Sequence, residues 1–503
     1  MLDIHLDPSS GTPLQQQIFQ TIHQALLQGK LPVGYRLPSI RELSRNLNVA
    51  RITVVLAYDK LIQNGYVKSR PGIGYEVVFS SSLQKAPQTT RIENAREPVR
   101  LMPASVGQDV YSPATPELYC RLGVPDPHAF PWPSWRKWNN SASNSKHHLL
   151  TRYHSPQGLL SLRAELVRFL RLTRGIETQP ENVIVINGIQ EGLALLTQLF
   201  ILNTKGCKVV TESPCYSGAW HLFNYYQAEV ETVAVDEQGI QVEQLPSHPA
   251  QFCYVTPSHQ YPVGGTLSLE RRCALLTWAQ KSGAYVIEDD YDSVFSYNSA
   301  PLPALKAMDE DDRVIYLGTF SKTLGPGMRM GYMVCPDAIL TSVQNMKALS
   351  NSGSNWLQQQ FLADYMHDQR YYSHLRKLEQ EYANRQRLLV EGLQRIFPQG
   401  QVLGVENGLH LTLVCPLTVP QVAQLRERCL QENIRFDTQA ELANGSETAW
   451  LKTVSSPLLF FGFGGLNQQQ LLHVLVVIER QVAILKQEAS AEMEVTPANM
   501  PPV

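Results

Sequence analysis

The sequence predicts an α/β protein: a small, mostly helical N-terminal domain, then a large domain with a doubly wound, mostly parallel sheet and a smaller C-terminal α+β lobe. Three observations predict this organisation. The chain has 503 residues, which is too long for one ordinary domain. Cations are concentrated near the N-terminus, between Lys30 and Arg70. From about residue 116 to 484, short apolar runs alternate with helical segments.

These shifts in composition set the expected boundaries. Residues 1–78 form the first domain, and residues 79–115 form a linker rich in proline, serine and threonine. The large domain covers residues 116–485, and residues 486–503 form a disordered tail. The chain contains no internal repeat.

Composition excludes several classes of protein. Apolar residues make up 43% of the chain and charged residues 17%, which excludes global disorder. The net charge of −2 argues against a wholly basic nucleic-acid protein. The eight cysteines are dispersed without a C-x-x-C pair, which argues against zinc fingers and a disulfide framework. We see no secretion signal and no apolar run of 18 residues, so we expect a cytoplasmic protein without a membrane partner.

Three short helices are predicted in the first domain. The first carries an apolar stripe at helical spacing and ends near Gly29. The second starts at a capping box, in which Ser39 caps and Glu42 follows three residues later. The third follows a tight turn at 48–50 and ends at Gly65. Residues 66–77 then predict two short strands around a basic Pro/Gly turn, so that the whole pattern is that of a winged helix-turn-helix.

The cations of this domain lie where such a fold contacts DNA. The stretch from Lys30 to Arg70 holds eight cations and two carboxylates, a local charge of +6. The alternative is an ordinary solvated face, but the charges coincide with the predicted helices and wing. A helix in the major groove uses cations for phosphates and polar side chains for base edges. The candidate DNA contacts are Arg41, Arg45, Arg51, Thr53, Lys68, Arg70 and Gly72.

The segments Leu37–Leu43 and Val49–Val54, followed by Tyr58, strongly resemble the GntR-type winged-helix domain over residues 12–78. One position departs from the pattern. Residue 50 is Ala, where the family usually has Ser or Thr. The missing hydroxyl removes a helix cap worth about 1 kcal/mol.

In the large domain, apolar runs predict parallel strands. They are residues 183–186, 207–210, 251–255, 285–287 and 313–317. Doubly wound folds place ligands at the carboxyl ends of such strands. The loop after the last run holds Lys322, which can form a Schiff base with an aldehyde cofactor. Thr319 and Ser321 offer hydroxyls to a phosphate, and Arg329 offers a bidentate clamp. Taken alone, a lysine in this position is more often a surface residue.

A second segment, Glu288–Tyr291, ends another predicted strand. Asp289 suits the role of a buried carboxylate that keeps a pyridine nitrogen protonated. Tyr291 suits a hydrogen bond to the phenolic oxygen of that ring. The alternatives are metal binding by the three consecutive carboxylates or a plain charged loop.

Two further loops face the same edge of the sheet, and a third carries His259. Gly188, Ile189 and Gln190 open a helix whose backbone N–H groups can hold a phosphate, although this segment taken alone is better explained as an ordinary strand-to-helix turn. Tyr216 can stack on a ring, although a loop tyrosine more often only packs. His259 lies in the loop after the run 251–255 and completes the candidate cofactor set.

Together these segments strongly resemble the fold-type I aminotransferase domain, which binds pyridoxal 5′-phosphate (PLP). Behind a GntR-type winged helix, the arrangement resembles the MocR subfamily of bacterial transcriptional regulators. The resemblance covers nearly the whole chain. It implies that Lys322 forms the Schiff base, Asp289 contacts the pyridine nitrogen, Tyr291 contacts the ring oxygen and Tyr216 stacks. It also implies a domain-swapped homodimer that binds double-stranded promoter DNA, and hence a nucleoid-associated protein.

One departure concerns substrate binding. Transaminases bind the substrate carboxylate with an arginine. In this family that arginine usually lies just before the final Gly-Phe segment. Here residues 456–463 contain no arginine, and the nearest cations are Arg435 and Lys452. The leading hypothesis is therefore a PLP-dependent regulator of bacterial metabolism that senses PLP or an amine effector through Lys322. The alternatives are a working aminotransferase with a DNA-binding module, and a dimerisation domain whose cofactor site has decayed.

Overall fold

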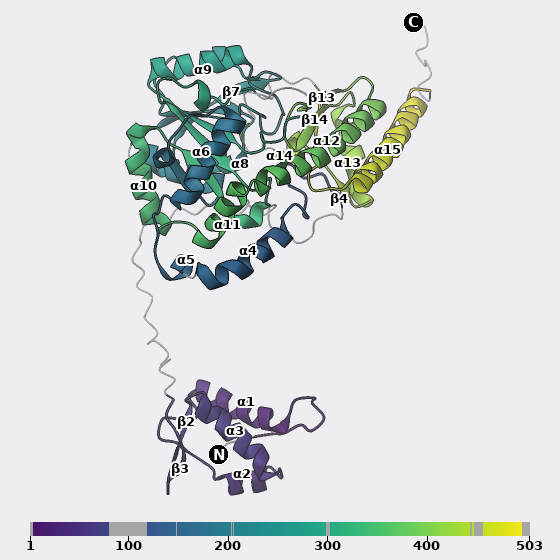
Figure 1. The fold of residues 1–503 in the computed structure, drawn as a ribbon. Coiled ribbons are helices and arrows are strands. Elements are labelled where there is room, and N and C mark those ends of the chain that lie inside the picture. Colours follow the sequence, from purple (N-terminus) through teal and green to yellow (C-terminus); the bar gives the residue numbers. More distant parts are fainter. Residues whose placement is uncertain are drawn as a thin grey trace, which may run out of the picture. The chain divides into compact units, whose positions relative to one another are not determined.

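The computed structural model describes residues 4–79, 118–146, 148–202, 204, 206–297, 302–442, 445–446 and 456–494 (Figure 1). The chain divides into two compact units, residues 1–101 and 102–503. Almost all of the predicted linker, 80–115, lies outside the described residues. Phe79 packs against the core of the first unit, so this unit extends one residue beyond its expected end at 78.

The first unit is the predicted winged helix-turn-helix. Its helices and strands are α1 (Leu14–Leu27), β1 (Arg36–Leu37), α2 (Ile40–Asn46), α3 (Arg51–Gln63), β2 (Val67–Arg70) and β3 (Gly74–Val77). The three strands form an antiparallel sheet in the order β1-β3-β2. Ile18 and Ile22 of α1 pack with Val54, Tyr58 and Leu61 of α3 in one buried cluster. The apolar stripes predicted from helical spacing therefore form the core of this unit.

The two helices of the helix-turn-helix begin differently, as the sequence predicts. At α2, the backbone N–H of Glu42 donates to the Ser39 hydroxyl at 3.2 Å, and the Glu42 carboxylate accepts from the Ser39 N–H at 3.4 Å. At α3, the N-cap residue Ala50 provides no side-chain hydrogen bond. The first turn of α3 therefore lacks the stabilisation that the capping box gives α2.

The large unit is built on an eight-stranded sheet in the order β5-β12-β11-β10-β9-β6-β7-β8. Its strands are β5 (Val183–Ile186), β6 (Lys208–Ser213), β7 (Glu229–Asp236), β8 (Gly239–Ile240), β9 (Phe252–Val255), β10 (Tyr285–Asp290), β11 (Val314–Thr319) and β12 (Gly331–Val334). The neighbours from β11 to β7 run parallel, while β12 runs antiparallel between β11 and β5. All five apolar runs singled out in the sequence lie in this sheet.

Helices cover both faces of the sheet (Figure 1). Because side chains alternate along a strand, Val183 and Val185 of β5 belong to one buried cluster, while Ile184 and Ile186 belong to another. The covering helices are α6 (Leu160–Arg174), α9 (Leu269–Ser282) and α11 (Trp356–His367) on one face, and α7 (Ile189–Phe200), α8 (Ser217–Tyr225) and α10 (Asp337–Asn351) on the other. Two more helices, α4 (Trp132–Ser145) and α5 (His148–Thr151), precede α6. The doubly wound architecture is confirmed.

The C-terminal lobe has its own antiparallel sheet in the order β13-β14-β17-β16. Its elements are β13 (Gln401–Leu403), β14 (His410–Val414), β16 (Asp437–Thr438), β17 (Leu458–Gly462), α12 (Arg370–Ile396), α13 (Val419–Gln431), α14 (Gln439–Leu442) and α15 (Gln468–Glu494). A parallel pair, β4 (Leu118–Tyr119) and β15 (Ile434–Arg435), joins the start of the unit to this lobe.

The expected start of the disordered tail at residue 486 is wrong, because α15 continues to Glu494. Val482 and Leu485 of this helix are buried in the lobe's core, and the helix extends past them for more than two turns. Residues 495–503 lie outside the described residues. None of the helices described here is long and apolar enough to span a membrane.

Candidate functional site

A cavity of about 220 Å³ lies at the carboxyl ends of the central strands of the large unit. The loops after β5, β6, β9, β10 and β11 all contribute to it. The predicted cofactor residues that line it are Gly188, Ile189, Gln190, Tyr216, Asp289, Tyr291, Thr319, Ser321, Lys322 and Arg329. Residues that lie more than 100 positions apart in the sequence therefore meet in one site, where doubly wound folds bind ligands.

Lys322 follows β11 and lies at the wall of this cavity. Its Nζ donates to the carbonyl oxygen of Gly123 at 2.6 Å. Burial lowers the pKa of this amine, while the nearby carboxylates of Asp292 and Asp289 oppose the shift. A lysine with a lowered pKa holds a larger neutral, nucleophilic fraction near pH 7 than a surface lysine does.

Asp289, near the end of β10, is buried beside the cavity. Its Oδ2 accepts a hydrogen bond from the Tyr254 hydroxyl at 2.6 Å, whereas its buried Oδ1 has no hydrogen-bond partner among the residues that the structure describes. Burial raises the pKa of this carboxyl to about 7, and the Tyr254 hydrogen bond opposes the shift. A buried carboxylate oxygen without a partner is costly, so the site favours a ligand that brings a donor or a positive charge to Oδ1.

One end of the cavity is suited to an anion. Gly188 precedes the first turn of α7 at a φ of +100°, and a Cβ there would lie 3.4 Å from the Arg329 guanidinium. The hydroxyls of Thr319 and Ser321 are 2.9 Å apart at the same cavity wall. Helix-terminal N–H groups, two hydroxyls and an arginine together form a phosphate-binding arrangement.

His259 does not line the cavity, contrary to its expected place in the cofactor set. It is buried behind Tyr291, and its Nδ1 lies 3.3 Å from the Tyr291 hydroxyl. The same Nδ1 lies 3.1 Å from Oδ2 of Asp292. His259 therefore contacts the cavity-lining Tyr291 without lining the cavity itself.

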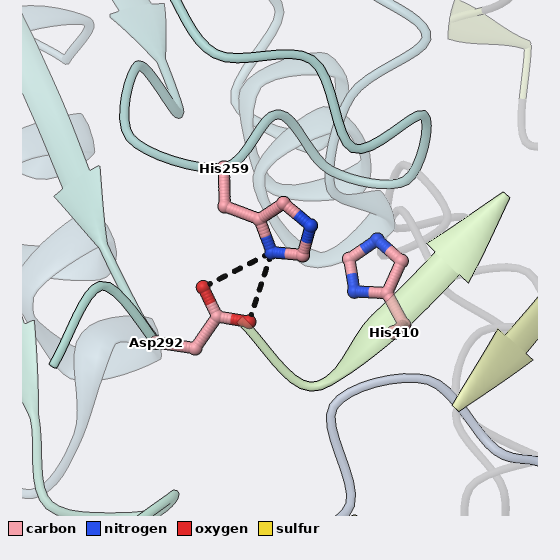
Figure 2. Close-up of side chains that lie close together, drawn as sticks. All are labelled: His259, Asp292 and His410. Carbon is pink, nitrogen blue, oxygen red and sulfur yellow. Dashed lines mark hydrogen bonds and ion pairs between the residues drawn. The ribbon is translucent and has the colours of Figure 1, made fainter. Parts of the chain in front are cut away.

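His259, Asp292 and His410 form a compact buried cluster (Figure 2). One potential metal-ligand atom from each residue lies within 4.8 Å of the others. Existing hydrogen bonds already pair Nδ1 of His259 with Asp292, and Nε2 of His410 with the Pro262 carbonyl at 3.0 Å. Burial holds the pKa of His410 well below its usual value, so this ring is neutral. Because His410 belongs to β14, the cluster joins the C-terminal lobe to the loops around the cavity.

The three consecutive carboxylates of β10 face separate partners. Glu288 accepts from the backbone N–H groups of Leu305 and Lys306, both at 2.9 Å. Asp290 pairs with Arg174 at 2.8 Å, whereas Asp289 faces the cavity. Alternation along the strand places Asp289 on the opposite face from Glu288 and Asp290, and each of the three carboxylates has its own surroundings, which argues against a shared metal site in this segment.

Several cavity residues were not assigned to the site from the sequence. They are Leu122, Gly123, Thr256 and Tyr261, and Tyr254 supports Asp289 from behind. Tyr261 lies in the same predicted loop as His259, which was the available signal. Tyr254 lies inside an apolar strand, and no local pattern distinguishes it from a core residue.

The segment before Gly462 contains no arginine and is apolar. Phe460 and Phe461 of β17 are buried in the hydrophobic core. Arg435 lies outside the cavity lining, with its guanidinium 4.6 Å from the centre of the Tyr119 ring and 3.7 Å from Asp437. Lys452 lies outside the described residues.

The predicted DNA contacts lie on the surface of the first unit. Arg41 and Arg45 on α2, Arg51 at the start of α3, and Lys68 and Gly72 in the wing are exposed, while Thr53 is half-buried. Arg70 is exposed but forms an ion pair with Glu76 across the wing at 2.9 Å. Arg70 must therefore exchange or share this partner before it can contact a phosphate.

Both units match known families. Residues 14–77 match the family of bacterial regulatory proteins called gntR, and residues 120–440 match aminotransferase class I and II. A solved kynurenine aminotransferase from Pyrococcus horikoshii shares the fold of the large unit, with a TM-score of 0.68 and 23% identity. The match covers 76% of this chain and 95% of that one.

Two relatives match most of this chain. The probable rhizopine catabolism regulatory protein MocR of Rhizobium meliloti is 32% identical over 82% of this chain and 83% of its own length. The pyridoxine biosynthesis transcriptional regulator PdxR of Corynebacterium glutamicum is 31% identical over 96% of this chain and 99% of its own length. The chain therefore belongs to the MocR/PdxR-type family of helix-turn-helix transcriptional regulators, in which a GntR domain precedes an aminotransferase class I and II domain.

Proposed function

We propose that this protein is a transcriptional regulator that binds promoter DNA through its winged helix and binds PLP at Lys322 in its large unit. One observation carries the cofactor proposal. A single cavity holds a lysine amine, a buried carboxylate oxygen without a partner among the described residues, and a group of anion-binding donors, which are the three features that PLP requires. When bound, PLP supplies an aldehyde that condenses with the lysine amine.

Each part of the cavity then has a defined task. The first turn of α7, Thr319, Ser321 and Arg329 hold the phosphate. Oδ1 of Asp289 would accept a hydrogen bond from the N–H of the protonated pyridine, and this contact would stabilise the ionised form of a carboxylate that is otherwise costly to bury.

The aromatic residues orient the ring. Tyr216 would stack on it, and the Tyr291 hydroxyl, which also contacts His259, would form a hydrogen bond with its phenolic oxygen. Lys322 is kept partly neutral by burial and is therefore ready to react.

In the first unit, Arg51 and Thr53 are placed at the start of α3 to reach base edges, while Arg41, Arg45 and Lys68 contact phosphates. We further propose a domain-swapped homodimer that presents two such units to two half-sites. The protein then acts in the cytoplasm, on the nucleoid. PLP or an amine effector changes promoter occupancy when it binds one conformation of the large unit more tightly than another.

A working aminotransferase is the second candidate, supported by the same cavity. The buried phenylalanines of β17, where transaminases have a substrate arginine, favour the regulator. An enzyme would convert bound PLP to its amine form repeatedly when supplied with amino donors and keto-acid acceptors. The regulator is expected to complete no more than one such half-reaction.

The cofactor proposal is tested by absorption spectra of the wild type, Lys322→Ala and the exposed-lysine control Lys281→Ala, each with added PLP. We expect a band near about 420 nm in the wild type and the control, and none in Lys322→Ala. A band of equal size in all three proteins would refute the assignment of Lys322.

The DNA proposal is tested by the affinity of Arg51→Gln for the protein's own promoter, measured by fluorescence anisotropy. A lost base or phosphate contact is expected to weaken binding about tenfold. Unchanged affinity would remove α3 from the interface.

A further inference from the structure

The second helix of the helix-turn-helix, α3, exposes apolar side chains beside its cations. Ile52 is 60% exposed and Leu56 is 45% exposed, and they lie about one turn apart on the helix. Within the described part of the first unit, neither side chain belongs to the buried cluster or packs against it, whereas Val54 and Ala57 are buried in that cluster. The core of this unit is therefore formed without Ile52 and Leu56.

The surroundings of Ile52 distinguish it from an ordinary exposed apolar residue, whose exposure alone assigns it no role. Ile52 occupies the first turn of α3, directly after the exposed Arg51, and this turn contains no carboxylate. Arg41 and Arg45 on α2 are exposed as well. An apolar side chain among exposed cations complements a polyanion that carries apolar groups in its grooves, and it does not suit an apolar protein surface.

The major groove of DNA offers one apolar group to such a side chain, the 5-methyl group of thymine. In helix-turn-helix docking, the N-terminal residues of the second helix contact base edges, while nearby cations contact phosphates. Ile52 is the second residue of α3, whereas Leu56 lies about one turn further from the N-terminal end of the helix. The side chain of Ile52 has no hydrogen-bond donor or acceptor, so among the four bases it gains most from contact with thymine.

We propose that Ile52 is a specificity-determining residue that contacts the 5-methyl group of one thymine in the major groove of each half-site. Arg51 and Thr53 keep the roles proposed above, and Ile52 adds a preference that hydrogen bonds do not supply. Burial of one methyl group against the isoleucine is expected to change the affinity for DNA about fourfold. The inference rests on the proposed function, because it requires that α3 enters the major groove.

The test removes the methyl group from the DNA and the isoleucine from the protein, separately and together. The full-length wild type, at a fixed concentration of PLP, first selects its binding sequence from a pool of random DNA. Each thymine of the selected half-sites is then replaced by deoxyuridine, which lacks only the methyl group. Fluorescence anisotropy at one salt concentration gives the affinity of each duplex for wild type, Ile52→Ala and Ile52→Val.

Leu27→Ala is the matched control. Leu27 is 51% exposed at the end of α1, a helix that carries none of the predicted DNA contacts. Ile52→Ala is expected to fold, because the side chain is exposed and alanine favours a helix more than isoleucine does. Thermal unfolding of each variant checks this expectation, and Ile52→Val tests the contact with a side chain that keeps most of its apolar surface.

We expect one thymine in each half-site at which deoxyuridine weakens binding of the wild type about fourfold. The same replacement should leave the affinity of Ile52→Ala unchanged, while Ile52→Val should keep most of the wild-type response. Leu27→Ala should respond as the wild type does.

Two results would overturn the inference while DNA binding through α3 stands. In the first, no thymine methyl group affects the affinity of the wild type. In the second, Ile52→Ala responds to deoxyuridine at every position as strongly as the wild type does. If the wild type selects no DNA sequence, the proposed function fails and this inference fails with it.

Discussion

Replacing Asp289 by asparagine is expected to change the stability of the PLP-free protein and its affinity for PLP in opposite directions. In the ligand-free cavity, Oδ1 of Asp289 is buried without a partner, and burial raises the pKa of the carboxyl from 3.8 to about 7. At pH values between these two pKa values, the Asp289 carboxyl is protonated in the folded protein but ionised in the unfolded chain. Raising the pH through this window therefore destabilises the fold, and the destabilisation is complete above about pH 7.

The size of the effect follows from the pKa difference. From pH 5 to pH 8, ionisation of Asp289 costs the folded state about 3 kcal/mol relative to the unfolded chain. Asparagine does not ionise, and its side-chain oxygen can still accept the Tyr254 hydroxyl that now bonds Oδ2. The PLP-free variant should therefore gain about 3 kcal/mol relative to the wild type as the pH rises from 5 to 8. PLP affinity at pH 8 should fall about 100-fold, because the buried pair with the pyridine nitrogen is broken.

Urea unfolding followed by tryptophan fluorescence measures this effect in the large unit alone, because all seven tryptophans lie between residues 132 and 450. The exposed carboxylate variant Asp311→Asn serves as the control and should show the wild-type dependence on pH. PLP affinity is measured separately by titration of the absorption band. A stability difference between wild type and Asp289→Asn that is the same at pH 5 and pH 8 would refute the reasoning, as would an undiminished affinity for PLP.

Two further predictions concern helix capping and a second buried carboxyl. Ser39→Ala should destabilise the first unit by about 1 kcal/mol, and Ala50→Ser should stabilise it by a similar amount. Thermal unfolding of that unit measures both effects. If both substitutions changed the unfolding temperature in the same direction, the capping argument would be contradicted. Burial raises the pKa of Glu212 from 4.5 to about 7, so the PLP-free protein should lose about 2 to 3 kcal/mol through this group between pH 5 and pH 8. Glu212→Gln should remove that loss, which urea unfolding at the two pH values would measure, and an unchanged pH profile would count against it.

Local patterns in the sequence were enough to predict much of the fold. The Ser39 capping box, the apolar stripe of α1 and the five apolar strands correspond to single stretches of chain, so propensity and periodicity are enough to predict them. The start of the C-terminal tail was not predictable in this way. Whether α15 continues past residue 486 depends on its packing in the lobe, and its last turns are polar in sequence.

In the candidate site too, some residues could be placed from local sequence patterns and others could not. Lys322, Asp289 and Arg329 lie near or after the ends of strands in recognisable segments, and they meet because parallel strands end at one edge of the sheet. His259 lies in such a loop too, yet it turns away from the cavity to pair with Asp292. The sequence cannot show this, because the loop's direction is set by contacts with β14, about 150 residues further along the chain.

The central claim is that PLP at Lys322 controls DNA binding. The most direct measurement is the affinity of the full-length protein for its own promoter with and without PLP, in wild type and in Lys322→Ala. We predict that PLP changes the wild-type affinity about fivefold or more, in either direction, and leaves Lys322→Ala unchanged. A wild-type affinity that does not respond to PLP, despite a Lys322-dependent absorption band, would contradict the claim.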